Sequence, residues 1–207
     1  MHHLGFVDVV TRPRSQRGEG ERLRTALLDA ATNLLGETHD VESLSVRAVT
    51  ARAGVSPTAL YLHFADKDDL RRAVKRRCYA ALRDALQADE VEDGRDPRMQ
   101  LRAMAHAYLR FAREQPGLYA ILFQTGVPNP APRFSEDELR DRPGHEVFEL
   151  VLGAVARCVD DEPTAFDTAC LAWMALHGRV AMQAAMPSFP FPDDDRFVAL
   201  LIDGCVG

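Results

Sequence analysis

Residues 45–70 constrain the fold of this chain more than any other stretch, because they hold helix-starting and helix-ending residues at short intervals. Ser45 and Ser56 are good N-cap residues, and Pro57 suits the first position of a helix, where its missing N–H costs nothing. Gly54 lies between them and can adopt the positive φ that a sharp helix exit needs. The pattern predicts two short helices joined by a tight turn, an arrangement typical of a helix-turn-helix.

The second of these helices, over about residues 57–63, has the residue types of a recognition helix. Thr58 and Ala59 are small, so the helix can enter a DNA major groove, which is about 12 Å wide. Leu60 and Phe64 are four residues apart and can anchor its inner face. We therefore expect this helix to pack on its own bundle with one side and to face DNA with the other.

The rest of the chain is also predicted to be helical, and no strand pattern or internal repeat occurs in it. Asp66 can cap a long helix that runs to about Ala88. Apolar residues at helical spacing and breaks at Gly and Pro predict the other helices. They are expected over about 21–36, 98–115, 118–124, a short segment from Ser135, a helix resuming after Gly144 to about 159, then 163–186 and 193–205.

Ten residues around the helix-turn-helix resemble the signature of the TetR family of transcriptional regulators. They are Ala53, Gly54, Val55, Ser56, Leu60, Tyr61, His63, Phe64, Lys67 and Leu70. The resemblance implies an all-α chain, in which an N-terminal three-helix DNA-binding bundle precedes a larger helical domain for ligand binding and dimerisation. It places a flexible basic arm at 1–20, the helix-turn-helix domain at 21–65 and the regulatory domain at 66–207.

The same resemblance implies a set of DNA-contacting residues. Tyr61 and His63 can donate to phosphate oxygens, and Lys67 adds a positive charge near a helix N-terminus, which already favours anions. The expected contact set is Ser45, Arg47, Ser56, Pro57, Thr58, Ala59, Tyr61, His63 and Lys67. An arm carrying Arg12, Arg14 and Arg17 can follow a minor groove or the phosphate backbone of DNA or remain a solvated tail, and the sequence favours neither.

The charge distribution agrees with a DNA-binding N-terminal part. The whole chain has a net charge of −6. Residues 11–77, however, carry 13 Lys and Arg against 9 Asp and Glu, whereas residues 78–207 carry 12 against 21. The basic excess therefore coincides with the helix-turn-helix.

The second half is rich in aromatic residues and methionines, which are typical of a hydrophobic core or of an adaptable ligand pocket. Trp173 and the pair His177-Gly178 resemble the Trp-His-Gly motif of one class of TetR C-terminal domains. By fold analogy we expect a pocket for a small apolar effector. Its predicted lining is Met104, Tyr108, Phe111, Phe123, Phe148, Trp173 and His177.

The last two long helices resemble the dimerisation face of the family, and a homodimer would present two recognition helices to a palindromic operator. Small residues there allow close approach of two helices. The predicted face comprises Leu171, Ala175, Gly178, Ala181, Ala185, Val198 and Leu201.

Neither a nucleophile motif nor a phosphate-binding glycine loop or metal-ligand spacing occurs in the sequence, so we expect no metal, no cofactor and no enzymatic activity. The absence of a long apolar run predicts no membrane span, and the N-terminus predicts a cytoplasmic protein. A repressor released by an apolar ligand is the favoured function. A DNA-binding regulator without an effector and, less favoured, an all-α enzyme remain alternatives.

Overall fold

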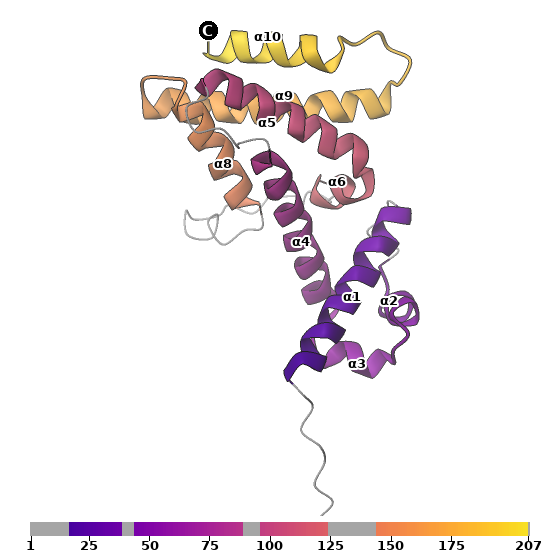
Figure 1. Cartoon of the computed structure of the whole chain (residues 1–207). Coiled ribbons are helices and arrows are strands. Elements are labelled where there is room, and N and C mark those ends of the chain that lie inside the picture. The colour runs from indigo at the N-terminus through magenta and orange to yellow at the C-terminus, as the bar shows by residue number, and fades with distance from the viewer. Residues whose placement is uncertain (1–16, 39–43, 89–95, 124–143, 207) are drawn as a thin grey trace, which may run out of the picture.

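The computed structural model describes residues 17–38, 44–88, 96–123 and 144–206, which contain nine helices and no strand (Figure 1). The predicted all-α class is therefore confirmed. The helices are α1 (Arg17–Thr38), α2 (Val46–Ala53), α3 (Pro57–Tyr61), α4 (Lys67–Gln87), α5 (Pro97–Glu114), α6 (Pro116–Phe123), α8 (His145–Ala156), α9 (Glu162–Ala185) and α10 (Asp194–Val206).

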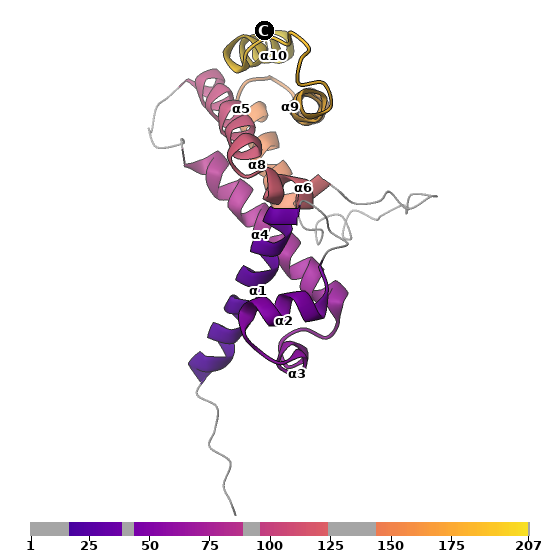
Figure 2. The same cartoon turned by 90° about the vertical axis from the view of Figure 1, so that its right-hand side faces the viewer.

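The helices form two groups connected by α4. Figure 1 shows α1, α2 and α3 at one end of the molecule, and α9 and α10 side by side at the other. Turned by 90°, the same arrangement shows α5, α6 and α8 between these ends (Figure 2). Helix α4 packs on α1 with one part and on α5, α6 and α8 with another, so it spans both groups.

Three of the predicted N-caps are confirmed by hydrogen bonds. Ser45 Oγ accepts from the N–H of Ala48 at 3.1 Å, and Ser56 Oγ accepts from the N–H of Ala59 at 3.3 Å. The Asp66 carboxylate accepts from the N–H of Asp69 at 2.6 Å. These caps fix the starts of α2, α3 and α4, because each satisfies a backbone donor that the helix leaves free.

Some predicted boundaries are wrong. The first helix begins at Arg17 and not near residue 21, so the last four residues of the predicted arm are its first turn, while residues 1–16 lie outside the described ranges. The glycines at 18 and 20 misled the prediction. Helix α3 ends at Tyr61, because the backbone N–H groups of His63 and Phe64 both turn back to the carbonyl oxygen of Leu60. The segment predicted from Ser135 also lies outside the described ranges.

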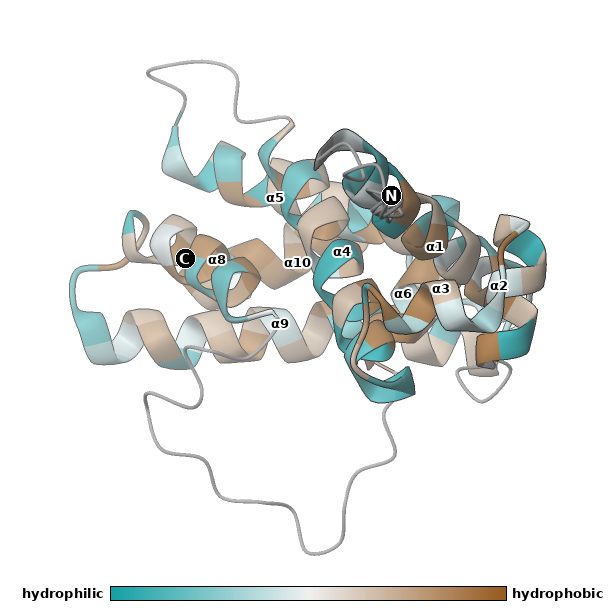
Figure 3. Ribbon diagram, turned by 90° about the horizontal axis from the view of Figure 1, so that it is seen from below, coloured by the Kyte–Doolittle hydropathy of each residue, from teal (hydrophilic) through white to brown (hydrophobic). Residues whose placement is uncertain are grey.

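Helix α6 is short and mostly apolar, as its brown colour in Figure 3 indicates. It packs on α1, α4 and α5, and therefore links the two groups of helices next to α4. At its start, Gly117 is in backbone contact with Gly36 near the end of α1, where any Cβ atom on Gly117 would collide with Gly36. Two helices can approach this closely only where side chains are missing.

Candidate DNA-binding site and regulatory core

The helix-turn-helix is formed by α2 and α3 and the turn between them. Gly54 has φ 69° and donates to the carbonyl of Ala51 at 3.3 Å, so it closes α2 in the left-handed conformation that the sequence predicts. Leu60 and Phe64 are both fully buried, which confirms that they anchor α3 to the bundle. The opposite side of α3 is left free to face a partner.

Several of the predicted DNA-contacting residues are exposed on α3 and around it. Tyr61 is 53% exposed, and Thr58 is also exposed. His63 and Lys67 are half-buried at the end of α3 and the start of α4. The remaining members of the predicted set are exposed or half-buried, namely Ser45, Arg47, Ser56, Pro57 and Ala59. None of the nine is enclosed in the core, so all can take part in binding.

Ion pairs hold the neighbouring helices in position around α3. Arg52 of α2 forms a bidentate pair with Glu37 of α1 at 2.7 and 2.5 Å. The hydrogen bond from Arg52 lowers the pKa of Glu37. Arg77 of α4 contacts Asp29 of α1 at 2.5 Å. These pairs link α1 to both α2 and α4, the helices that precede and follow α3 in the chain.

Two features of this site were not predicted. Leu62 is 77% exposed directly after α3, beside Tyr61. The guanidinium of Arg24 in α1 lies 5.2 Å from the centre of the Phe64 ring and covers the inner anchor of α3. Periodicity gives no signal for either, because Leu62 follows Leu60 by two residues and Arg24 is distant in sequence from Phe64.

Five of the seven predicted ligand residues meet in one aromatic cluster between α5, α6, α8 and α9. Trp173 is edge-on to Tyr108 and Phe148, at centroid distances of 5.6 and 6.3 Å. The ring centroid of Phe123 lies 4.3 Å from that of His177 and 6.2 Å from that of Trp173. The cluster brings together residues from four helices, and its members from α5 and α9, Tyr108 and Trp173, are 65 residues apart in the sequence.

The cluster has a member that the prediction omitted. Tyr119 of α6 lies within 6 Å of Tyr108, Phe123 and His177, measured between ring centres. The signal for it was available, since Tyr119 and Phe123 are four residues apart and so share one face of α6. Tyr119 and Phe123 together make α6 the wall of the cluster nearest the DNA-binding helices.

A chain of hydrogen bonds crosses this otherwise apolar cluster. The hydroxyl of Tyr119 lies 2.6 Å from Nδ1 of His177 and 3.2 Å from the hydroxyl of Tyr108. Burial lowers the pKa of His177, which favours the neutral ring. Burial also raises the pKa of Tyr119 to about 12, so its hydroxyl stays protonated. A protonated Tyr119 can therefore donate to a neutral His177 and accept from Tyr108.

The other two predicted ligand residues lie outside the ring cluster. Met104 is buried and lines a cavity of about 10 Å³ with Tyr108, Leu176 and Ile202. Phe111 is buried on α5 and makes no ring contact with the cluster within the described residues. A cavity of this size holds at most about one water molecule, so this part of the interior is closed.

The predicted dimerisation residues divide into two groups. Leu171 is 56% exposed, Ala181 and Ala185 are also exposed, and Ala175, Gly178 and Leu201 are half-buried. Val198 is only 1% exposed and packs in the core of the protomer, so its assignment to an outer face is wrong. On α10 the exposed apolar residue is instead Leu200, and Met174 and Met182 form an exposed apolar stripe with Leu171 on α9. The prediction mistook the inner face of α10 for the outer one.

Within the described ranges, no group of three or more His, Cys, Asp or Glu side chains is placed to hold a metal ion. None of the helices found there is both long enough and apolar enough to cross a membrane. The four cysteines form no disulfide, and burial raises the pKa of Cys78 to about 12, which keeps this thiol protonated.

Comparisons with known sequences agree with this architecture. Residues 27–74 match the family described as bacterial regulatory proteins, tetR family, and residues 101–205 match the tetracyclin repressor-like C-terminal domain. An uncharacterized HTH-type transcriptional regulator from Haemophilus influenzae is 46% identical over 50 residues, which are 24% of this chain and 24% of that protein. The match therefore spans about a quarter of the length of that relative.

Solved structures share the fold over nearly the whole chain. A protein of unknown function from Rhodococcus sp. RHA1 is 25% identical, with a TM-score of 0.70 and coverage of 94% of this chain and 97% of that one. A TetR protein from Acinetobacter baumannii, solved in complex with minocycline, is 20% identical, with a TM-score of 0.55 and 93% of each chain covered. One family model matches the helix-turn-helix region, and the other matches about half of the chain, residues 101–205. This chain therefore belongs to the TetR family of DNA-binding transcriptional regulators.

Proposed function

We propose that this protein is a repressor that acts in the cytoplasm as a homodimer on a palindromic operator and is released by a small, mostly apolar ligand. One observation carries the ligand response. Helix α6 contributes Tyr119 and Phe123 to the aromatic cluster and also presses Gly117 against Gly36 of α1. A change in the cluster can therefore reach a DNA-binding helix through one short element.

The cluster is the proposed ligand site because it combines large apolar surface with a few polar atoms. Rings of Tyr108, Phe123 and Trp173 supply the walls, as expected for a small-molecule pocket. A ligand that carries one hydrogen-bonding group matches the polar chain of Tyr108, Tyr119 and His177. The A. baumannii protein with bound minocycline supports a ligand role for this fold.

The contacts between the rings support a mechanism for release. The ring centres of Tyr108 and Phe123 lie 5.6 and 6.2 Å from that of Trp173, so a ligand that enters between them must separate these rings. The hydrogen bond between Tyr119 and His177 joins α6 to α9, so opening the cluster there displaces α6. A ligand that binds only the opened form shifts the protein towards that form, and with it the position of α1. We propose that α6 acts alongside α4 in this transmission.

Dimerisation is proposed to occur through the outer faces of α9 and α10. Leu171, Met174 and Met182 are each about half exposed or more on α9, and Leu200 is 62% exposed on α10. A contiguous apolar stripe of this kind is typical of an association surface. Pairing two protomers there would place two recognition helices on successive major grooves of one operator.

The test has two stages. Footprinting on the DNA upstream of the coding gene should reveal a palindromic site, and a thermal-shift screen of small apolar compounds should find ligands that release it. Binding without any compound-dependent release would favour the alternative of a regulator without an effector. Failure to bind any upstream fragment would contradict the proposal as a whole.

A further inference from the structure

The groove between α5, α9 and α10 has the shape and chemistry of a second ligand site. We propose that it binds a small amphipathic anion, a carboxylate attached to a hydrocarbon chain. This site does not depend on the aromatic cluster or on the proposed ligand response.

The groove has a volume of about 250 Å³ and two chemically different parts. Its floor is apolar and consists of Leu109 and Ala112 of α5 with Val180 and Ala184 of α9. Its polar rim consists of Arg113, Gln183 and Asp194. A hydrocarbon chain that covers this floor buries apolar surface, which favours binding. The polar groups of the rim determine which polar group the other end of the ligand must carry.

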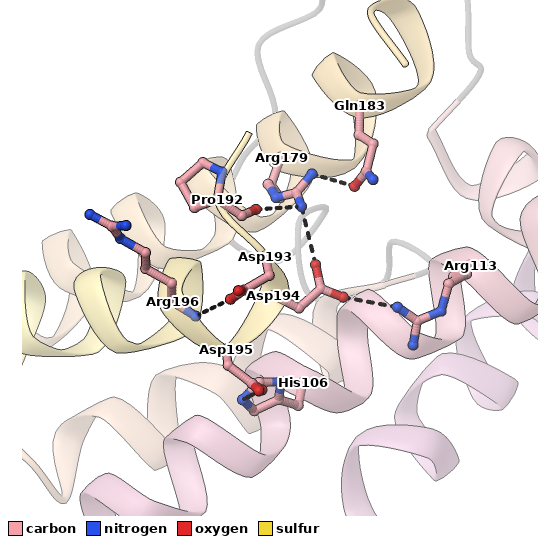
Figure 4. A network of polar contacts seen from close by, with 9 residues as sticks. All are labelled: His106, Arg113, Arg179, Gln183, Pro192, Asp193, Asp194, Asp195 and Arg196. Atoms are coloured by element: carbon pink, nitrogen blue, oxygen red, sulfur yellow. Dashed lines mark hydrogen bonds and ion pairs between the residues drawn. The ribbon is translucent and has the colours of Figure 1, made fainter. Parts of the chain in front are cut away.

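Arg179, which is only 8% exposed, fixes the polar rim from behind (Figure 4). It donates to the side-chain oxygen of Gln183, to the carbonyl of Pro192 at 3.0 Å and to Asp194 at 3.2 Å. The Phe191 and Phe197 rings lie 5.6 and 5.8 Å from its guanidinium carbon. Buried contacts on several sides determine which way the Gln183 amide and the Asp194 carboxylate point.

The residues of the rim already form hydrogen bonds with one another. The polar groups that remain available to a ligand are mainly donors. One oxygen of Asp194 accepts from Arg179 and the other from Arg113, at 2.9 Å. The oxygen of Gln183 is occupied by Arg179, so its NH₂ group remains. Among the described residues, Asp194 is the single polar partner of Arg113, whose side chain is 65% exposed and keeps further N–H groups available.

The donors left on the rim favour an anion. Arg113 and Asp194 are the charged residues that line the groove, and the buried guanidinium of Arg179 lies behind Asp194. Figure 4 shows the neighbouring carboxylates directed elsewhere, Asp193 to the backbone N–H of Arg196 at 2.8 Å and Asp195 to His106 at 3.7 Å. A carboxylate matches the free donors of Arg113 and Gln183, since it accepts hydrogen bonds through both oxygens.

The groove differs in position from the other two functional surfaces. Val180 and Gln183 lie more than a quarter turn around α9 from Leu171 and Met174, whereas Ala184 lies closer to Met174. A partner seated on Leu171 and Met174 therefore leaves the Val180 and Gln183 side of the groove open. Val180 follows His177 by three residues, so the groove begins one turn beyond the aromatic cluster.

Isothermal titration calorimetry with octanoate tests the proposal on the full-length protein. Octanoate should bind, and 1-octanol, which has the same chain without the charge, should bind at least about tenfold more weakly. Arg113→Gln should weaken octanoate binding by at least about tenfold, and Ala184→Trp should abolish it by filling the groove. Arg157→Gln is the matched control, since Arg157 is exposed directly after α8 and donates to Gln100 at 3.1 Å.

Asp194→Asn tests the sign of the charge, because removing the carboxylate should strengthen octanoate binding if the groove takes an anion. Thermal melting of each variant shows whether it folds. If the Arg113 or Asp194 variant does not fold, octanoate binding to Ala184→Trp tests the proposal in its place. The proposal is overturned if octanoate does not bind at millimolar concentration, or if Trp173→Ala abolishes binding while Ala184→Trp leaves it unchanged. The latter result would place octanoate in the aromatic cluster.

Discussion

Gly117 of α6 and Gly36 of α1 are in direct backbone contact, and a Cβ atom added to Gly117 would come within 2.8 Å of the Gly36 carbonyl oxygen. This contact joins the helix that carries Tyr119 and Phe123 to the first helix of the DNA-binding group. A methyl group at Gly36 itself would meet nothing within 4 Å. The two glycines therefore offer a matched pair of substitutions at one contact.

Gly117→Ala should weaken operator binding without any ligand, because the added methyl group forces α6 and α1 apart. The expected loss is at least fivefold in affinity, within the range of about 1–3 kcal/mol that is typical of coupling between sites. Gly36→Ala should keep the affinity of the unmodified protein. Fluorescence anisotropy with labelled operator measures both, and equal affinities for the two variants would refute a role for this contact.

Tyr119→Phe should lower the free energy of unfolding by about 1–3 kcal/mol, because it leaves the Tyr108 hydroxyl and His177 Nδ1 without their shared partner. Tyr61→Phe removes a hydroxyl from an exposed ring and should have almost no effect on stability. Urea denaturation of the three proteins provides the comparison. Equal midpoints for Tyr119→Phe and the unmodified protein would show that the hydrogen-bond chain is not stabilising.

The lowered pKa of His177 predicts a pH dependence of stability. The unfolded chain takes up a proton near the ordinary histidine pKa of about 6.5, whereas the folded protein resists protonation to lower pH. The contribution is fully present above that pH and is lost as the pH falls through the lowered value. The unmodified protein should therefore lose more unfolding free energy between pH 7.5 and 5.5 than His177→Gln does. The opposite order would mean that burial does not disfavour the charged ring.

Some residues of the helix-turn-helix should position the protein on the DNA backbone, and others should determine which base sequence it prefers. Lys67→Ala should weaken binding to all DNA sequences and flatten the salt dependence, by roughly 0.9 in the slope of log K against log salt for one lost phosphate contact. Thr58→Ala should instead change the preference between operator variants. Arg157→Ala, far from α3, removes a positive charge as a control. A Lys67 variant with an unchanged salt slope would contradict a phosphate contact.

The apolar stripe on α9 should control assembly. Leu171→Glu should give folded monomers with weak operator binding, because it places a charge in the proposed dimer face. Met99→Glu is the matched control, since Met99 is 57% exposed on α5 and lies off the stripe. Val198→Glu should unfold the protein, because this side chain lies in the core. Sedimentation velocity distinguishes the cases, and a monomeric unmodified protein at micromolar concentration would contradict the dimer.

Local patterns in the sequence predicted the helix-turn-helix well. Ser45, Gly54 and Asp66 act through neighbours within a few residues, so the sequence shows both partners of each contact. The aromatic cluster was predicted in large part from composition and fold analogy. Tyr119 was missed although it shares one face of α6 with Phe123, whereas its hydrogen bond to His177, 58 residues away, depends on packing and has no signal in the sequence.

Other errors have the same physical origin. Val198 and Leu200 are both apolar, and the positions of α5 and α9 against α10 determine which of them is buried. The contact between Gly36 and Gly117, like the groove beside Arg113, depends on how helices cross. Such features follow from tertiary packing, and periodicity along one helix carries no signal for them.

The most direct test of the proposed function is operator release followed together with the fluorescence of Trp173, the single tryptophan of the chain. A compound from the thermal-shift screen is titrated into the complex of the protein with its labelled operator. We expect Trp173 fluorescence to change and operator affinity to fall about 5- to 150-fold over the same range of compound concentration. Compounds that alter Trp173 fluorescence at saturation and leave operator affinity unchanged would contradict the coupling of the aromatic cluster to DNA binding.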